Sequence, residues 1–423
     1  MVTLTIVTMF ALLFLGVPVV FSVCFAAILG VATTDDLNMV FAIRKMVTGL
    51  DSFPMLACPF FILAGDLMSA GGMSERIVRF SNATLGFIRG GLGHVTVGAS
   101  MLFAGVSGSA VADTSAMGAL LIPQMKKQGY PSAFAASLQA ASGSLGIIIP
   151  PSLVMILYGA ITGESVAKLF MGGAVPGFIF GIGMMVIVYV YATKWGWRGT
   201  GRFDVAEVWA AAKSSSLALV APIIIMGGIL GGVFTPTEAG VVACIYGAIV
   251  GRFVYKSLTW NVLWESLVRT GEIAGYVLIM LAAATFMGQI FTLGEVPEKI
   301  MALLLSLTDN PTLIFIMILM SIVFAGFFLD VFAMLALFVP VLMPIAKSMH
   351  YDPIHFGVLV CICTVLGAAT PPVGTLLFIT MAIAETSMSQ MIRYIIPFIV
   401  MMVTVIFSAV FFHEIVTFLP SLI

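Results

Sequence analysis

Long apolar runs separated by short polar stretches fill this chain of 423 residues. A helix needs roughly 20 apolar residues to cross a bilayer, so the pattern predicts an all-α polytopic membrane protein with about ten or eleven transmembrane helices. The run at 3–30 carries no charged residue and is expected to form the first crossing. The apolar runs lie at 3–30, 53–72, 91–123, 131–162, 166–194, 215–233, 237–255, 271–293, 311–346, 353–384 and 390–412.

Two of these runs, 91–123 and 311–346, are too long for a single crossing and contain polar residues near their midpoints. The first is interrupted at 105–113 and the second at 326–330. A re-entrant hairpin, which enters the membrane and returns to the same side, explains both the length and the polar tip. A pair of ordinary kinked helices is the alternative.

Two further runs contain a double proline, Pro150-Pro151 and Pro371-Pro372. Proline removes a backbone hydrogen-bond donor and clashes with the preceding helical turn. Two successive prolines near glycine therefore predict that the helix unwinds at this point. Kinks that only help neighbouring helices to pack are the alternative.

The hairpins and breaks belong to an internal duplication, because Pro371 follows Pro150 by 221 residues. Upstream of each hairpin, 74–88 and 295–307 mix charged with apolar residues and predict amphipathic helices along the membrane faces. The offset of 221 residues also aligns Phe103, Ala104, Gly105, Pro123, Lys126, Tyr130, Gly146, Glu164 and Pro176 with Phe324, Ala325, Gly326, Pro344, Lys347, Tyr351, Gly367, Glu385 and Pro397.

The basic residues indicate how the two copies face the membrane, because cytoplasmic loops carry an excess of lysine and arginine. If the base of the first hairpin is cytoplasmic, thirteen of the 18 basic residues lie inside. An odd number of crossings then separates the copies, so the repeats are inverted, as in secondary transporters whose site lies near the midplane. The inside set is Arg76, Arg79, Arg89, Lys126, Lys127, Lys194, Arg198, Arg202, Lys213, Arg252, Lys256, Arg269 and Arg393, and the outside set is Arg44, Lys45, Lys168, Lys299 and Lys347.

Composition narrows the function classes further. Hydrophobic residues make up 61% of the chain and charged residues 9%, against about 25% charged residues in soluble domains. The net charge of -1 offers no basic surface for nucleic acid. The sequence has no Walker loop, so ATP does not drive the protein directly, and it has no cluster of titratable groups of the kind that an enzyme needs.

The helix breaks and hairpin tips are the candidate binding groups. Unwound backbone leaves carbonyl oxygens without partners, and a small hard cation such as sodium can satisfy them. The first predicted sodium site comprises Ser107, Ser109, Gly146, Ile149 and Pro151. The second, at the equivalent place in the other copy, comprises Gly326, Asp330, Gly367, Thr370 and Pro372.

An anionic substrate is expected beside these cations, because the free N–H groups and dipoles of half-helix N-termini favour negative charge. The predicted substrate residues are Ser144, Ser152, Asp113 and Thr375. Asp113 and Asp330 lie by the hairpin tips, where a carboxylate can coordinate a cation, carry a proton or cap a half-helix.

Four segments resemble the large membrane subunit of TRAP transporters, the tripartite ATP-independent periplasmic uptake systems. They are Leu102–Thr114, Gly146–Ser152, Gly231–Gly240 and Thr370–Gly374, and the similarity extends over essentially the whole chain. The resemblance implies sodium-coupled uptake of an organic acid, such as a dicarboxylate, sialic acid or another sugar acid, across the bacterial inner membrane. It also implies two partners, a periplasmic substrate-binding protein and a small four-helix membrane subunit, and no organic cofactor.

The resemblance further implies an elevator-type fold, in which hairpins and broken helices move as one body. On this basis 91–162 and 311–386 form the two halves of the transport domain. Scaffold spans with the arm helices occupy 1–90 and 163–310, and 387–423 forms a C-terminal scaffold span. A single-component sodium/dicarboxylate symporter of similar fold is the alternative; a gated channel or a membrane enzyme is less favoured.

Overall fold

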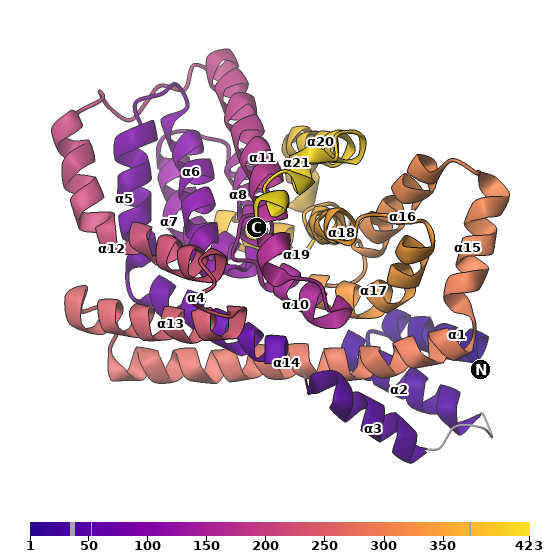
Figure 1. Cartoon of the computed structure of the whole chain (residues 1–423). Coiled ribbons are helices and arrows are strands. Elements are labelled where there is room, and N and C mark those ends of the chain that lie inside the picture. Colours follow the sequence, from indigo (N-terminus) through magenta and orange to yellow (C-terminus); the bar gives the residue numbers. More distant parts are fainter. Residues whose placement is uncertain (34–38, 52, 372–373) are drawn as a thin grey trace.

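The computed structural model describes residues 1–33, 39–51, 53–371 and 374–423, and the regular secondary structure in these ranges is entirely helical, without strands. Eight of its helices are long and apolar enough to cross a membrane, and shorter apolar helices account for most of the remaining apolar runs. This confirms the prediction of an all-helical polytopic membrane protein. Figure 1 shows the first copy (α5–α8) and the second copy (α15–α17) on opposite sides, with α14 running beneath both.

The helix bounds confirm the duplication, because a shift of α7 by 221 residues gives the bounds of α17. The first copy comprises α4 (Ala57–Ala70), α5 (Met73–Leu85), α6 (Gly91–Ser107), α7 (Ala110–Lys127), α8 (Ser132–Gly143), α9 (Leu145–Ile148), α10 (Leu153–Thr162) and α11 (Val166–Trp195). The second comprises the end of α14 (Trp260–Leu293), α15 (Val296–Leu307), α16 (Pro311–Ala325), α17 (Val331–Ser348), α18 (Pro353–Ala368), α19 (Thr375–Ala384) and α20 (Met388–Phe411).

The N-terminal region differs from the single crossing expected over 3–30. It forms two short helices, α1 (Val2–Phe14) and α2 (Val19–Ala32), which pack against each other. Gly16, with φ of 81°, and Pro18 interrupt the helix between them. A left-handed residue followed by proline ends a helix, and hydropathy alone does not register such a turn. Helix α3 (Met39–Leu50) follows, together with the short helix η1 (Phe53–Leu56).

The count of spans supports inversion of the two copies. Helices α12 (Val205–Leu230) and α13 (Pro236–Ile249) follow the first copy, and η2 (Val250–Val254) extends α13. Five candidate spans, from Phe53–Ala70 to Pro236–Val254, precede the span Trp260–Leu293 that begins the second copy. Because five is odd, this count predicts that corresponding helices of the two copies run in opposite directions across the membrane.

The two copies pack against each other crosswise. The second limb of the first hairpin, α7, packs against α19, and the equivalent limb α17 packs against α10. At the end of α7, Lys126 Nζ donates to the carbonyl oxygen of Ala384 (3.1 Å) and lies 3.4 Å from Glu385 Oε2. Each hairpin is therefore joined to the broken helix of the other copy.

An equivalent tyrosine follows each hairpin outside the apolar helices, Tyr130 after α7 and Tyr351 after α17. Burial raises the pKa of both phenols to about 12, so both stay neutral at physiological pH. The Tyr351 hydroxyl donates to the carbonyl oxygen of Pro311 (2.6 Å), which closes the base of the second hairpin.

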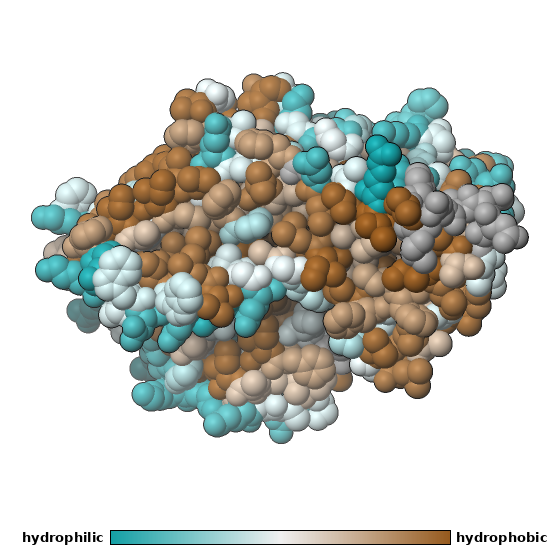
Figure 2. Space-filling model, turned by 90° about the horizontal axis from the view of Figure 1, so that it is seen from below, coloured by the Kyte–Doolittle hydropathy of each residue, from teal (hydrophilic) through white to brown (hydrophobic). Residues whose placement is uncertain are grey.

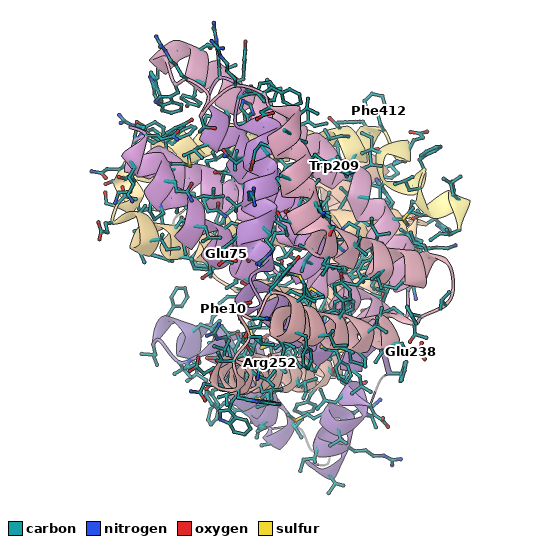
Figure 3. The ribbon with its side chains drawn as sticks, turned by 90° about the vertical axis from the view of Figure 1, so that its left-hand side faces the viewer. Phe10, Glu75, Trp209, Glu238, Arg252 and Phe412 are labelled. Atoms are coloured by element: carbon teal, nitrogen blue, oxygen red, sulfur yellow. The ribbon has the colours of Figure 1, made fainter. Side chains whose placement is uncertain are left out.

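The surface is typical of a membrane protein. Figure 2 shows hydrophobic side chains over much of the face seen from below, with hydrophilic residues gathered toward its edges. Figure 3 places Glu238 and Arg252 toward opposite ends of α13 and its extension. Glu238 completes a capping box with Thr235, whose backbone N–H donates to Glu238 Oε2 at 2.8 Å. Charges at the ends of an apolar helix are consistent with its crossing a bilayer.

Candidate functional site

The first hairpin turns sharply at a glycine. Helix α6 ends at Ser107, Gly108 adopts φ of 62°, and Ser109 begins α7 as its N-cap. The Ser109 hydroxyl accepts a hydrogen bond from the backbone N–H of Ala112 (3.4 Å), and the Ser107 hydroxyl accepts one from Ser109 N–H (3.4 Å). Both serines predicted to bind a cation therefore lie at the tip, as the polar interruption indicated.

The first tip meets the first helix break directly. The backbone N–H of Leu153 donates to the carbonyl oxygen of Gly108 (3.1 Å). A Cβ added to Gly146 would lie 2.9 Å from the Ser109 carbonyl group, so only glycine fits there. The structure thus brings Ser109 and Gly146, two members of the first predicted sodium site, into backbone contact.

The break itself lies between α9 and α10. Ile149 is extended, Pro151 follows, and Ser152 begins α10 as its N-cap, accepting from the Met155 N–H at 3.4 Å. A Cβ added to Gly108 would lie 2.9 Å from the Pro151 carbonyl oxygen. The unwound carbonyls therefore face the hairpin tip, where two half-helix N-termini also meet.

The second tip and break meet through two glycines. A Cβ on Gly326 would lie 2.9 Å from the Gly367 Cα, and a Cβ on Gly367 would lie 2.6 Å from the Gly326 Cα. Asp330 begins α17 as its N-cap and accepts hydrogen bonds from the N–H groups of Phe332 (3.0 Å) and Ala333 (3.1 Å). Of the roles open to the two aspartates, capping is therefore the one that Asp330 performs here.

The other predicted residues of the second copy lie at the end of α18 and the start of α19. The Thr370 hydroxyl donates to the carbonyl oxygen of Leu366 (2.5 Å), and its N–H donates to that of Gly367 (3.1 Å). Thr375 is the first residue of α19. Pro372 lies outside the described residues.

Asp113 and Ser144 lie deeper than the tips. Asp113 is one turn into α7, is fully buried and does not cap the helix. Ser144 is also fully buried, and its hydroxyl donates to the carbonyl oxygen of Ala141 at 2.6 Å. The predicted substrate role of these two side chains stays a prediction.

Sequence reasoning missed Tyr276, whose hydroxyl donates to Asp330 Oδ2 (2.5 Å). Tyr276 lies on α14 and thus ties the second hairpin to the helix that runs beneath both copies. Nothing in the hydropathy pattern singles out a tyrosine within an apolar run, so only the structure reveals this contact.

A cavity of about 610 Å³ lies between α3, α10, α14 and α17. The cavity lies between the second hairpin and α14, away from the hairpin tips. Its polar lining consists of Thr48, Thr162, Thr285, Gln289, Thr292 and Lys347.

Comparison with known proteins decides the family. Residues 6–415 match the family model described as the tripartite ATP-independent periplasmic transporter, DctM component. The chain belongs to this family. Its relatives are named as transporter permeases, which confirms that the chain is not an enzyme.

Two relatives are similar to the chain over nearly their whole length. The sialic acid TRAP transporter large permease protein SiaM of Vibrio cholerae is 36% identical, with 97% of this chain and 96% of the relative aligned. The 2,3-diketo-L-gulonate TRAP transporter large permease protein YiaN of Escherichia coli is also 36% identical, with 95% of each aligned.

Two longer relatives are only partly covered. The sialic acid TRAP transporter permease SiaT of Haemophilus influenzae is 38% identical over 97% of this chain, which spans 67% of SiaT. The chain spans 62% of the isethionate TRAP transporter permease DctMQ of Oleidesulfovibrio alaskensis, at 36% identity. Among solved structures, the Alcanivorax borkumensis YdaH transporter matches with a TM-score of 0.59 at 14% identity, covering 90% of this chain and 91% of YdaH. That likeness concerns the fold alone.

Proposed function

We propose that this permease carries an organic acid across the bacterial inner membrane, driven by a sodium gradient. The observation that carries the proposal is the meeting of each hairpin tip with the helix break of its own copy, at Gly108 and Leu153 and at Gly326 and Gly367. The first meeting point gathers unwound carbonyl groups and the N-termini of α7 and α10. At the second, Gly326 at the end of α16 touches Gly367 in the last turn of α18. Two such places suit two small cations with an anion beside them.

Sodium fits the donor set of the tips. The groups are backbone carbonyls, the hydroxyls of Ser107 and Ser109, and the carboxylate of Asp330, all of them hard oxygen donors. In hydrocarbon each unsatisfied carbonyl costs several kcal/mol, so a bound cation would also hold the tip against the break.

An organic acid is the substrate class that this arrangement suits. The relatives are named for sialic acid, 2,3-diketo-L-gulonate, isethionate and C4-dicarboxylate, and all of these carry an acidic group. Ser152 and Thr375 lie at the starts of α10 and α19, where the helix dipoles favour a carboxylate. We expect Ser144, whose fully buried hydroxyl donates to the carbonyl oxygen of Ala141, to support this site.

The transport step is an elevator movement. The crosswise packing of α7 with α19 and of α10 with α17 supports 91–162 and 311–386 as one body. In this proposal α12, α13 and α14 stay fixed while that body moves. A periplasmic binding protein delivers the substrate and a small four-helix membrane subunit completes the scaffold, because the family is tripartite.

Uptake by proteoliposomes containing the permease and both partners tests the proposal. We expect an inward sodium gradient to drive accumulation of the organic acid, choline in place of sodium to abolish it, and ATP to have no effect. Ser107→Ala with Ser109→Ala removes two oxygen donors from the first tip. It should raise the sodium concentration for half-maximal uptake at least tenfold, since even one charge-assisted contact contributes roughly 1.5–3 kcal/mol.

The control variant is Ser214→Ala with Ser216→Ala on α12. These hydroxyls donate to carbonyls of their own helix, Ala211 (2.9 Å) and Lys213 (2.9 Å), so the sodium response should not change. Accumulation without sodium would contradict the coupling. A normal sodium response in the Ser107/Ser109 variant would contradict the first site alone.

A further inference from the structure

Among the buried polar side chains of the first copy that lack hydrogen-bond partners, five lie on the hairpin helices α6 and α7 and on α8. They are Ser100 on α6, Asp113 and Thr114 on α7, and Gln139 and Ser142 on α8. Each is 0% exposed. Buried polar groups in folded proteins are nearly always paired, and an unpaired carboxylate in a membrane domain is the most costly case.

The five side chains belong to three helices, α6, α7 and α8, that all pack against one another. The Ser100 hydroxyl faces the Asp113 carboxyl from beyond hydrogen-bonding distance. A Cβ added to Gly143, the residue after Ser142, would lie 2.9 Å from the Cα of Thr114, so α7 and α8 touch here. One turn along the same contact, a Cβ added to Gly118 would lie 3.3 Å from Gln139 Cγ.

The second copy has no such cluster at the equivalent positions. The offset of 221 residues places Met334, Leu335, Val360 and Cys363 opposite Asp113, Thr114, Gln139 and Ser142. Ser321 stands opposite Ser100, but its hydroxyl donates to the carbonyl oxygen of Ile318 (2.7 Å). The duplicated fold therefore does not itself require polar groups at these positions.

We propose that these five side chains form a third cation site, buried in the first copy and specific for a monovalent ion, with sodium as the ion. The cluster offers one carboxylate, three hydroxyls and one amide oxygen, which are hard donors in a number that suits sodium. One positive charge neutralises the single carboxylate, whereas a divalent ion would leave a net charge in the membrane interior. The inference rests on the proposed sodium coupling and assigns Asp113 to this ion rather than to the substrate.

Counting bound sodium tests the third site without reliance on transport. Equilibrium binding of radioactive sodium is measured on purified wild-type permease and on Asp113→Asn, which keeps the size of the side chain and removes its charge. We expect Asp113→Asn to bind one sodium ion fewer per chain. Ser100→Ala should keep the number of ions and weaken one of them about tenfold, in line with the loss of one ligand.

Ser321→Ala is the matched control, because it removes the equivalent hydroxyl of the second copy and should bind sodium as the wild type does. Thermal melting in choline checks that each variant folds. If Asp113→Asn does not fold, the tenfold weakening of sodium binding in Ser100→Ala tests the third site instead. Unchanged sodium binding in both variants, as expected if Asp113 carries only a proton, would overturn the third site and leave the proposed function intact. Absence of sodium binding by the wild type would overturn both.

Discussion

The two copies of the repeat have the same arrangement of helices but differ in the side chains that they bury. Between hairpin and broken helix the first copy places Asp113, Gln139 and three hydroxyls, whereas the second places methionine, leucine, valine and cysteine at four of the five equivalent positions. Polar groups without partners are costly in a membrane interior. Both copies therefore share the same helices, but only the first buries unpartnered polar side chains at these positions.

The tips of the two copies also differ. Ser109 caps the first hairpin with a neutral hydroxyl, and the adjoining Gly108 is hydrogen-bonded to its own helix break. Asp330 occupies the same place in the second hairpin, brings a carboxylate and is bonded to Tyr276 of α14. The first tip is thus tied to the broken helix of its own copy, and the second is tied to α14.

The largest effect should come from adding a methyl group to the glycine at which hairpin tip and broken helix touch, in either copy. Gly367→Ala places a methyl group 2.6 Å from the backbone of Gly326, and Gly146→Ala places one 2.9 Å from that of Ser109. We expect both to abolish sodium-driven uptake. Melting in detergent should show a loss of about 1–3 kcal/mol, larger for Gly367→Ala because its contact is tighter.

Gly201→Ala is the control, since no atom lies within 4 Å of the added Cβ. Its stability and uptake should match the wild type. If Gly146→Ala transported normally while Gly367→Ala did not, only the second tip would need to close against its break, and the two copies would differ in mechanism as well as in composition.

A smaller effect is expected from Tyr276→Phe, which removes the hydroxyl that donates to Asp330. A hydrogen bond to a partly exposed carboxylate contributes about 1 kcal/mol, so this conformation should lose roughly that much stability. Melting of the purified permease measures the change, with Tyr189→Phe on the exposed side of α11 as the control. Equal melting of the two variants would show that the second tip is not held by the scaffold.

The hydropathy pattern and the positions of prolines were sufficient to predict the hairpins, the helix breaks and the repeat of this fold. Both hairpins, both breaks and the offset of 221 residues follow from apolar length, proline and glycine, which act through the local backbone. The split of 3–30 into two helices was missed because a turn at Gly16 and Pro18 leaves the run apolar.

The site was predicted only in part. Glycines and N-caps at the tips could be located from sequence, because their roles depend on neighbours within a few residues. The partnership of Tyr276 with Asp330 joins residues 54 apart in the chain, and the cluster around Asp113 joins three helices. Such contacts depend on tertiary packing, although the loss of polarity at the equivalent positions of the second copy was available as a signal.

The central claim is that the two copies face the membrane in opposite directions, and the sidedness of Lys126 and Lys347 tests it most directly. Each is replaced by cysteine in a background lacking the five native cysteines, and intact cells and inverted membrane vesicles are treated with a membrane-impermeant thiol reagent. Position 126 should be labelled only from the cytoplasmic face and position 347 only from the periplasmic face. Labelling of both positions from the same face would contradict the claim.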